Sequence, residues 1–320
     1  MEPTGSLAQG SEMRIPSPSP SPPPTAPAPG PTTDRRSVRT LPLKLPAVLL
    51  LLLWSIVPLA MTLWFSFQRY NLLNPTEHGW VGFENYHCLV TNPGLAKSIG
   101  NTLLIVGWVL VITVSLGTLL AVLFDQDFFG RGVARVLMIA PFFVMPTVSA
   151  LIWKNMLMHP ANGVISFLLM SVGLEPIDWF SQAPLASIIV IVAWQWLPFA
   201  ALILLTAIQA LDPERKEAAR MDGAGPFSMF FFIIIPHLAR AISVVVMIET
   251  LFLLAVFAEI FVTTAGGPGL ASTNLAFLIY RYALLEYDIG AASAGGVVAI
   301  ILANVVAAFL VRAIAKNIEA

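Results

Sequence analysis

Long apolar stretches dominate this sequence and limit what the chain can fold into. Five of them contain no Asp, Glu, Lys or Arg: 45–67, 99–124, 136–153, 184–211 and 289–311. One more run, 241–262, contains only Glu249 and Glu259 as charged residues and is the fifth of the six in chain order. A helix of about 20 apolar residues spans a hydrocarbon core of ~30 Å, and irregular backbone cannot face lipid. The sequence therefore predicts an all-α, polytopic membrane protein with six transmembrane helices. The apolar run 164–174 is too short to cross and predicts a helix at the interface or on the bundle.

The amino-acid composition supports the same class. Hydrophobic residues make up 57% of the chain and charged residues 11%, whereas soluble domains carry about 25% charged residues. An ordinary soluble enzyme is therefore excluded. The net charge of −1 argues against nucleic acid as a partner, because phosphate binding needs a basic surface.

The N-terminal segment differs in kind from the rest. Residues 1–44 are rich in Pro and Ser, and such a segment cannot bury enough apolar surface to offset its ordering entropy. We expect a disordered cytoplasmic tail over 1–44 and a transmembrane domain over 45–320.

The basic residues indicate the orientation. If the N-terminus is cytoplasmic, most of the 17 Lys and Arg residues fall on the cytoplasmic side, as the positive-inside rule requires. The outer side keeps only these: Arg69, Lys97, Lys154 and Arg281. Both termini are therefore predicted to lie on the cytoplasmic side of the membrane.

Motifs for enzymatic chemistry are absent from the sequence. It contains no Walker A phosphate loop, no HExxH, no GxSxG and no CxxC, and its four histidines lack ligand spacing. We therefore expect no catalytic residue, no metal site and no cofactor, and the chain is predicted to be a transport protein rather than an enzyme.

The segment between the fourth and fifth predicted spans is the most informative. Asp212 is a suitable N-cap and Pro213 suits the first helical position. Gly223 and Gly225 are suited to ending that helix and turning the chain. The segment 212–238 is thus predicted to be a short helix, a glycine turn and a return to the membrane.

This segment resembles the EAA loop of permease subunits of binding-protein-dependent ABC importers. The resemblance rests on Glu217-Ala218-Ala219, on Asp222-Gly223-Ala224 and on Ile235-Pro236. The second proline that many members have is replaced here by Arg240. The resemblance implies that this helix couples to a separate ATPase subunit. Glu217 would contribute polar docking contacts, Ala218 and Ala219 would form a close face, and Gly223 would make the turn. Asp222 belongs to the same set of coupling residues.

Further motifs are similar to the maltose and glycerol-phosphate branch of that family. They are Val81–Tyr86, Asn101–Leu103, Phe129–Gly132, Ala150–Lys154 and Phe261–Gly269. The C-terminal stretches 292–296 and 315–317 also resemble polyol importers for mannitol or sorbitol. The resemblance implies an inner-membrane subunit for carbohydrate or polyol import. Its partners would be a second permease subunit, two ATP-binding subunits and an extracytoplasmic solute-binding protein.

Polar residues inside the predicted spans are candidates for the solute path, because intramembrane polar groups are costly. Glu249 is suited to accept hydrogen bonds from solute hydroxyls, and Glu259 follows it in the same run. The alternative for both is a structural pairing, to an Asn, Gln or Thr on a neighbouring helix or to Arg281, which we favour for Glu259. The aromatic and amide side chains of 194–196 and 304 are also candidates for the path or for helix packing: Trp194, Gln195, Trp196 and Asn304.

A transporter of another class is the rival interpretation. Glu249 and Glu259 would then form a proton relay in an ion-coupled secondary transporter. Such a transporter has no need of a coupling helix, so the segment 212–238 distinguishes the two interpretations.

Overall fold

The computed structural model describes residues 41–74, 76 and 78–318, and these are mostly helical. Residues 1–40, which make up most of the predicted tail, lie outside the described residues. Helix α1 (Leu41–Phe65) begins four residues before the predicted boundary at 45. The all-α class is confirmed; the β-structure of the described residues is a short pair of strands, β1 (Gln68–Arg69) and β2 (Gly79–Trp80).

Among the described residues, five helical segments are long and apolar enough to cross a membrane, and a bent helix pair adds a sixth if its two helices count as one span. The long segments are α1, α3 (Pro93–Asp125), α8 (Pro184–Gln209), α14 (Ile289–Ile318) and the continuous run Pro226–Leu253. That run consists of α10 (Pro226–Met229), the π-helical turn η2 (Phe230–Ile234) and α11 (Ile235–Leu253). The predicted return helix and the predicted fifth span are therefore one continuous segment.

The predicted third span is broken rather than kinked. Helix α4 (Arg131–Phe143) and helix α5 (Pro146–Ile152) meet at an angle of 106°. Val144 and Met145 are extended, because the residue before a proline is disfavoured in the helical conformation. The π-helical turn η1 (Trp153–Leu157) follows α5, and the short helix α6 (Val164–Ser171) matches the predicted non-spanning helix.

The run 241–262 is not one helix either. Helix α11 ends at Leu253, and Glu259 lies on a separate short helix, α12 (Ala258–Thr263). Asn274 Nδ2 donates a 2.5 Å hydrogen bond to the carbonyl of Val256 in the break, so a backbone acceptor released from the helix is satisfied. The expectation that Glu249 and Glu259 share a helix is therefore wrong.

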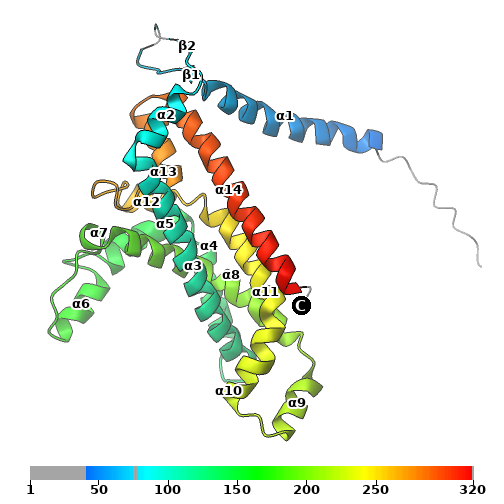
Figure 1. The fold of residues 1–320 in the computed structure, drawn as a ribbon. Coiled ribbons are helices and arrows are strands. Elements are labelled where there is room, and N and C mark those ends of the chain that lie inside the picture. The colour runs from blue at the N-terminus through cyan, green and yellow to red at the C-terminus, as the bar shows by residue number, and fades with distance from the viewer. Residues whose placement is uncertain (1–40, 75, 77, 319–320) are drawn as a thin grey trace, which may run out of the picture. The chain divides into compact units, whose positions relative to one another are not determined.

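Helix α3 packs most extensively against α8, with α11 against both. A Cβ added at Gly117 of α3 would lie 3.0 Å from Ala200 Cβ of α8, so the two backbones approach closely here. Figure 1 shows the short helix α9 (Pro213–Met221) at the opposite end of α3 from α2 (Glu84–Thr91).

Two polar side chains position the segment 258–274. Asn101 of α3 donates to the carbonyls of Leu270, Ala271 and Thr273 at 2.8–3.2 Å. Lys154 of η1 donates through Nζ to the carbonyls of Val262 and Thr263, the last two residues of α12, at 3.0 and 2.8 Å. The remaining short elements are α7 (Trp179–Gln182), α13 (Leu275–Tyr280) and the π-helical turn η3 (Arg281–Leu285).

Candidate functional site

Helix α9 forms at the position that the sequence predicts. Asp212 Oδ1 accepts a 3.0 Å hydrogen bond from the Glu214 backbone N–H, and Pro213 occupies the first turn. Gly223 ends the helix with a φ of +79°, a left-handed conformation that an L side chain adopts only at a cost. The Ala224 backbone N–H then donates to the Ala219 carbonyl at 2.9 Å, which closes the helix end.

Helix α9 is tied to the spanning helices by specific contacts. Lys216 Nζ lies 2.9 Å from Asp125 Oδ2 at the end of α3, and both side chains are half-buried near the surface. His237 Nε2 of α11 lies 2.9 Å from the Ala207 carbonyl of α8. The Lys216–Asp125 pair thus links α9 to α3. The His237 contact holds the start of α11 to α8.

The five residues expected to act in coupling gather on α9 and its C-terminal turn. Glu217, Ala218, Asp222 and Gly223 are exposed, and Ala219 is half-buried. Ala218, Ala219 and Asp222 line an open groove of about 510 Å³ between α9 and the return helix. Glu217 is not among the groove residues, so the carboxylate and the alanine face present two separate surfaces.

Three exposed apolar side chains at this groove were missed by the sequence reasoning: Phe232 lines it, and Met221 and Phe227 lie outside its lining. Met221, Phe227 and Phe232 are 88%, 80% and 78% exposed. Their position next to a charged amphipathic helix was a usable signal, because a patch of large apolar side chains on an exposed segment marks an interaction surface.

A second cavity lies among aromatic residues of α4, α8 and α11. It has a volume of about 620 Å³, and Trp196 and Gln195 line it together with Phe142, Phe199 and Phe252. The ring centroids of Trp196 lie 5.8 Å from Phe142, 5.8 Å from Phe199 and 5.2 Å from Phe252. Gln195 donates through Nε2 to the Val144 carbonyl at 2.9 Å, and its buried Oε1 has no partner among the described residues. The cavity thus combines flat apolar faces with a largely buried amide.

The structure does not bring the other two candidates of this group into the cavity. Trp194 packs edge-to-face against Trp153, with ring centroids 5.8 Å apart. Asn304 is exposed on α14, and its amide donates to the Ile300 carbonyl of its own helix at 2.8 Å. Neither residue lines the aromatic cavity.

The two intramembrane carboxylates are separate and buried. Glu249 is fully buried and accepts a 2.6 Å hydrogen bond from Thr113 Oγ1 of α3, which is the pairing to a neighbouring Thr considered for it. Arg281 pairs with Glu286 at 3.1 Å rather than with either carboxylate. Among the described residues, no group of three His, Cys, Asp or Glu side chains is placed to hold a metal ion.

The comparisons with known proteins agree on one family. Residues 113–320 match the family described as the binding-protein-dependent transport system inner membrane component. A probable ABC transporter permease protein of Sinorhizobium fredii is 34% identical, over 78% of this chain and 81% of that protein. A trehalose/maltose transport system permease protein of Thermococcus litoralis is 31% identical, over 78% of this chain and 84% of that protein.

A solved structure has the same fold. It is that of a bacterial ABC transporter involved in the import of the acidic polysaccharide alginate, with a TM-score of 0.74 and 23% identity. The match covers 86% of this chain and 94% of the other.

Proposed function

Because the chain belongs to the family of binding-protein-dependent transport system inner membrane components, we propose that it is one of two permease subunits that enclose the path of an ATP-driven importer for a sugar or sugar alcohol. Members of this family are multi-pass transport subunits of the inner membrane and not enzymes. ATP would be hydrolysed by two partner subunits, and an extracytoplasmic solute-binding protein would deliver the solute.

The observation that carries the proposal is the geometry of α9. The helix stands at one end of α3, keeps Glu217 exposed, and is joined to α3 by the Lys216–Asp125 ion pair. The exposed Met221, Phe227 and Phe232 add apolar surface for a partner. Closure of the ATPase subunits around this segment would shift the transmembrane helices between two arrangements.

The aromatic cavity supports a saccharide or polyol as the solute. The C–H faces of such molecules pack on aromatic rings, and their hydroxyls can hydrogen-bond to an amide such as that of Gln195. Trp196 and Gln195 would therefore contact the solute, whereas Trp194 would support the cavity wall. A relative whose name states trehalose and maltose transport points to the same solute class.

The arrangement of the two carboxylates offers no support for a proton relay. Glu249 is paired with Thr113 inside the helix bundle, and Glu259 lies on another helix. We therefore do not favour the ion-coupled secondary transporter, and we assign Glu249 to the contact between α3 and α11.

The orientation follows from the same proposal. Helix α9 must face the cytoplasm to meet an ATPase, which places both termini inside, as the distribution of basic residues predicts. The region of α2 and the β1–β2 pair then lies on the outer side.

The test uses the importer reconstituted with its partner subunits. Glu217→Arg and Gly223→Pro should each abolish ATPase stimulation by the loaded solute-binding protein, because one reverses a docking charge and the other cannot adopt a φ of +79°. Arg312→Glu reverses an exposed charge on α14, outside α9 and on the same side of the membrane, and serves as the matched control. Full stimulation in both α9 variants would refute the proposal.

A further inference from the structure

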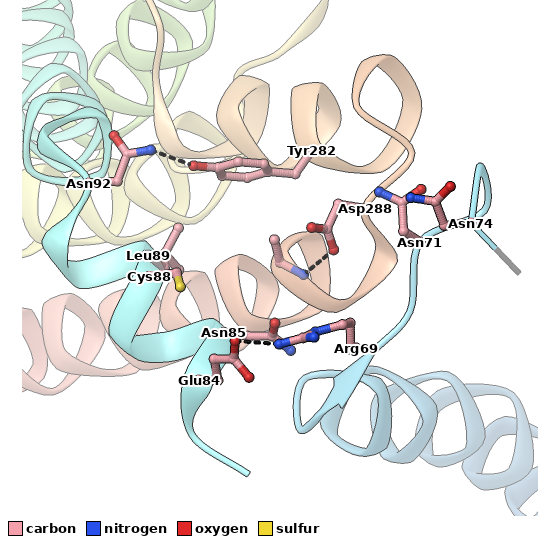
Figure 2. A pocket seen from close by; sticks show the side chains of 11 residues that line it. Arg69, Asn71, Asn74, Glu84, Asn85, Cys88, Leu89, Asn92, Tyr282 and Asp288 are labelled. Atoms are coloured by element: carbon pink, nitrogen blue, oxygen red, sulfur yellow. Dashed lines mark hydrogen bonds and ion pairs between the residues drawn. The ribbon is translucent and has the colours of Figure 1, made fainter. Parts of the chain in front are cut away.

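A polar cavity lies at the α2 end of the chain, apart from α9 and from the aromatic cavity. It has a volume of about 370 Å³, near the lower end of the ~300–1,000 Å³ of small-molecule sites. Figure 2 shows its wall: α2 contributes Glu84, Asn85, Cys88 and Leu89, and Asn92 follows α2 directly. The chain after β1 contributes Asn71 and Asn74, and Tyr282 and Asp288 face them.

Backbone contacts hold the walls of this cavity in place. The Leu72 backbone N–H donates to the Tyr287 carbonyl at 2.9 Å, and the Ile289 N–H donates to the Tyr70 carbonyl at 2.9 Å. Asn85 Nδ2 donates to the carbonyls of Ser66 and Gln68 at 2.9 and 2.8 Å. The site is therefore largely formed before any ligand arrives, which lowers the cost of binding.

The hydrogen bonds within the wall leave polar atoms for a ligand. Tyr282 Oη accepts a 3.0 Å hydrogen bond from Asn92 Nδ2, so its own O–H is directed elsewhere. Burial, with a smaller contribution from Glu286, raises the pKa of the Tyr282 phenol above its usual value, and the phenol remains a donor at neutral pH.

Further acceptors and donors line the same cavity. Asp288 Oδ1 accepts from the Ala291 backbone N–H at 2.9 Å, and no described residue donates to its second carboxylate oxygen. Asn74 makes no side-chain hydrogen bond to another described residue, and it belongs to the lining. Amides, a carboxylate and a phenol supply donors and acceptors side by side, which is what a hydroxyl group requires because it both donates and accepts.

The charge of the wall selects among hydroxyl-rich ligands. The Arg69 guanidinium is already paired with Glu84 at 2.5 Å, so Asp288 adds a net negative charge to the lining. An anionic ligand such as a sugar phosphate would meet that charge without a free cation opposite it.

We propose that this cavity, walled by Asn74, Tyr282 and Asp288, binds a neutral polyhydroxylated molecule of about monosaccharide size. The site is distinct from the aromatic cavity, and the proposal does not depend on the coupling role of α9. If the cavity faces the outer side, it meets the molecule before the transport path does.

Cys88 makes a direct test possible. It lies in the cavity wall with an exposed side chain and is the only cysteine in the sequence, so its alkylation by a maleimide reports on this cavity alone. The full chain would be placed in lipid nanodiscs without partner subunits, and the labelling rate measured by mass spectrometry. The probes are mannitol, sorbitol and glucose as neutral polyhydroxyl compounds, with glycerol 3-phosphate as the anion.

The expected result is protection by the neutral probes. At about twice the Kd, a bound ligand that covers the thiol lowers the alkylation rate about threefold. Tyr282→Phe and Asp288→Asn should weaken that protection; an Asn at position 288 can still accept the Ala291 N–H, so the helix start is kept. Asn155→Ala, an exposed asparagine outside the cavity, should leave protection unchanged.

Three results would overturn the proposal. They are an alkylation rate unaffected by every neutral probe, equal protection by glycerol 3-phosphate, and undiminished protection in both the Tyr282→Phe and the Asp288→Asn variants. Because the assay contains no ATPase, its failure is separate from failure of the coupling experiment.

Discussion

Thr113 Oγ1 donates a 2.6 Å hydrogen bond to Oε2 of Glu249, and this contact joins α3 to α11 where solvent has no access. The two residues are 136 positions apart in the sequence. The second oxygen of Glu249, Oε1, has no hydrogen-bond partner among the described residues. The pair is thus a single polar link inside an otherwise apolar contact between two spanning helices.

Removing that link should destabilise the chain. Thr113→Val keeps the shape of the side chain but leaves the carboxyl group without its donor, and we expect a loss of about 1–2 kcal/mol in the free energy of unfolding. The measurement is the thermal unfolding midpoint of the purified chain in detergent. Thr118→Val is the matched control, because Thr118 bonds only to the Val114 carbonyl of its own helix. A similar loss in both variants would contradict the role of the interhelical bond.

The link between α9 and α3 should matter for coupling more than for stability. Lys216→Ala removes the ion pair with Asp125; pairs near the surface contribute only about 0–1 kcal/mol, so the unfolding midpoint should barely change. Solute-stimulated ATPase activity of the assembled importer should fall severalfold, because α9 loses a rigid contact to a spanning helix. The exchanged pair Lys216→Asp with Asp125→Lys should recover part of the activity. No recovery together with a large loss of stability would assign the pair a purely structural role.

The amide of Asn101 should control the order of the loop that follows α12. Asn101→Ala removes the donor to three carbonyls, and each unsatisfied buried acceptor costs about 1–3 kcal/mol. We expect hydrogen exchange over 264–274 to accelerate by at least about tenfold, which corresponds to ~1.4 kcal/mol of local opening. Ser98→Ala, one turn earlier, deletes a buried hydroxyl without a partner among the described residues and should be neutral or stabilising. Unchanged exchange in the Asn101 variant would show that other contacts order the loop.

Replacing either of two glycines on α3 with alanine should change the stability of the chain in opposite directions. At Gly117 a Cβ would meet Ala200 Cβ at 3.0 Å and the Ala201 backbone nitrogen at 3.2 Å, and neither atom can move aside easily. At Gly107 no described atom outside the adjoining turn of α3 lies within 4 Å of the added Cβ. Gly107→Ala should therefore stabilise by up to about 1 kcal/mol through helix propensity, whereas Gly117→Ala should destabilise. The thermal unfolding midpoints of both variants show whether each change stabilises or destabilises the chain. Stabilisation by Gly117→Ala would mean that α3 and α8 separate at no cost.

Local patterns account for the parts of the fold that could be predicted. The uncharged runs predict α3, α8 and α14 because lipid permits only internally bonded backbone. Asp212, Pro213 and Gly223 predict α9, since caps and turns depend on a few neighbouring residues. The proline at position 146 indicates a disturbance, but the angle of the break depends on packing with α8 and Gln195, which a sequence pattern does not contain.

Contacts between distant segments account for what could not be predicted. The aromatic cavity requires Phe142, Trp196 and Phe252 to meet from three helices, and the Thr113–Glu249 and Lys216–Asp125 pairs each depend on a helix crossing. A run of apolar residues specifies that a helix is buried, but the face that it turns to each neighbour is set by the close packing of the bundle. For the same reason Asn304 was a reasonable candidate by residue type, and its exposed position on α14 became evident only in three dimensions.

Lys154 attaches to α12 through the peptide oxygens of Val262 and Thr263. Every amino acid supplies such an oxygen, so positions 262 and 263 are free to change during evolution without releasing the lysine. Correlated substitution between 154 and these positions is therefore not expected, and a survey of co-varying residues would overlook an attachment that holds the two segments together.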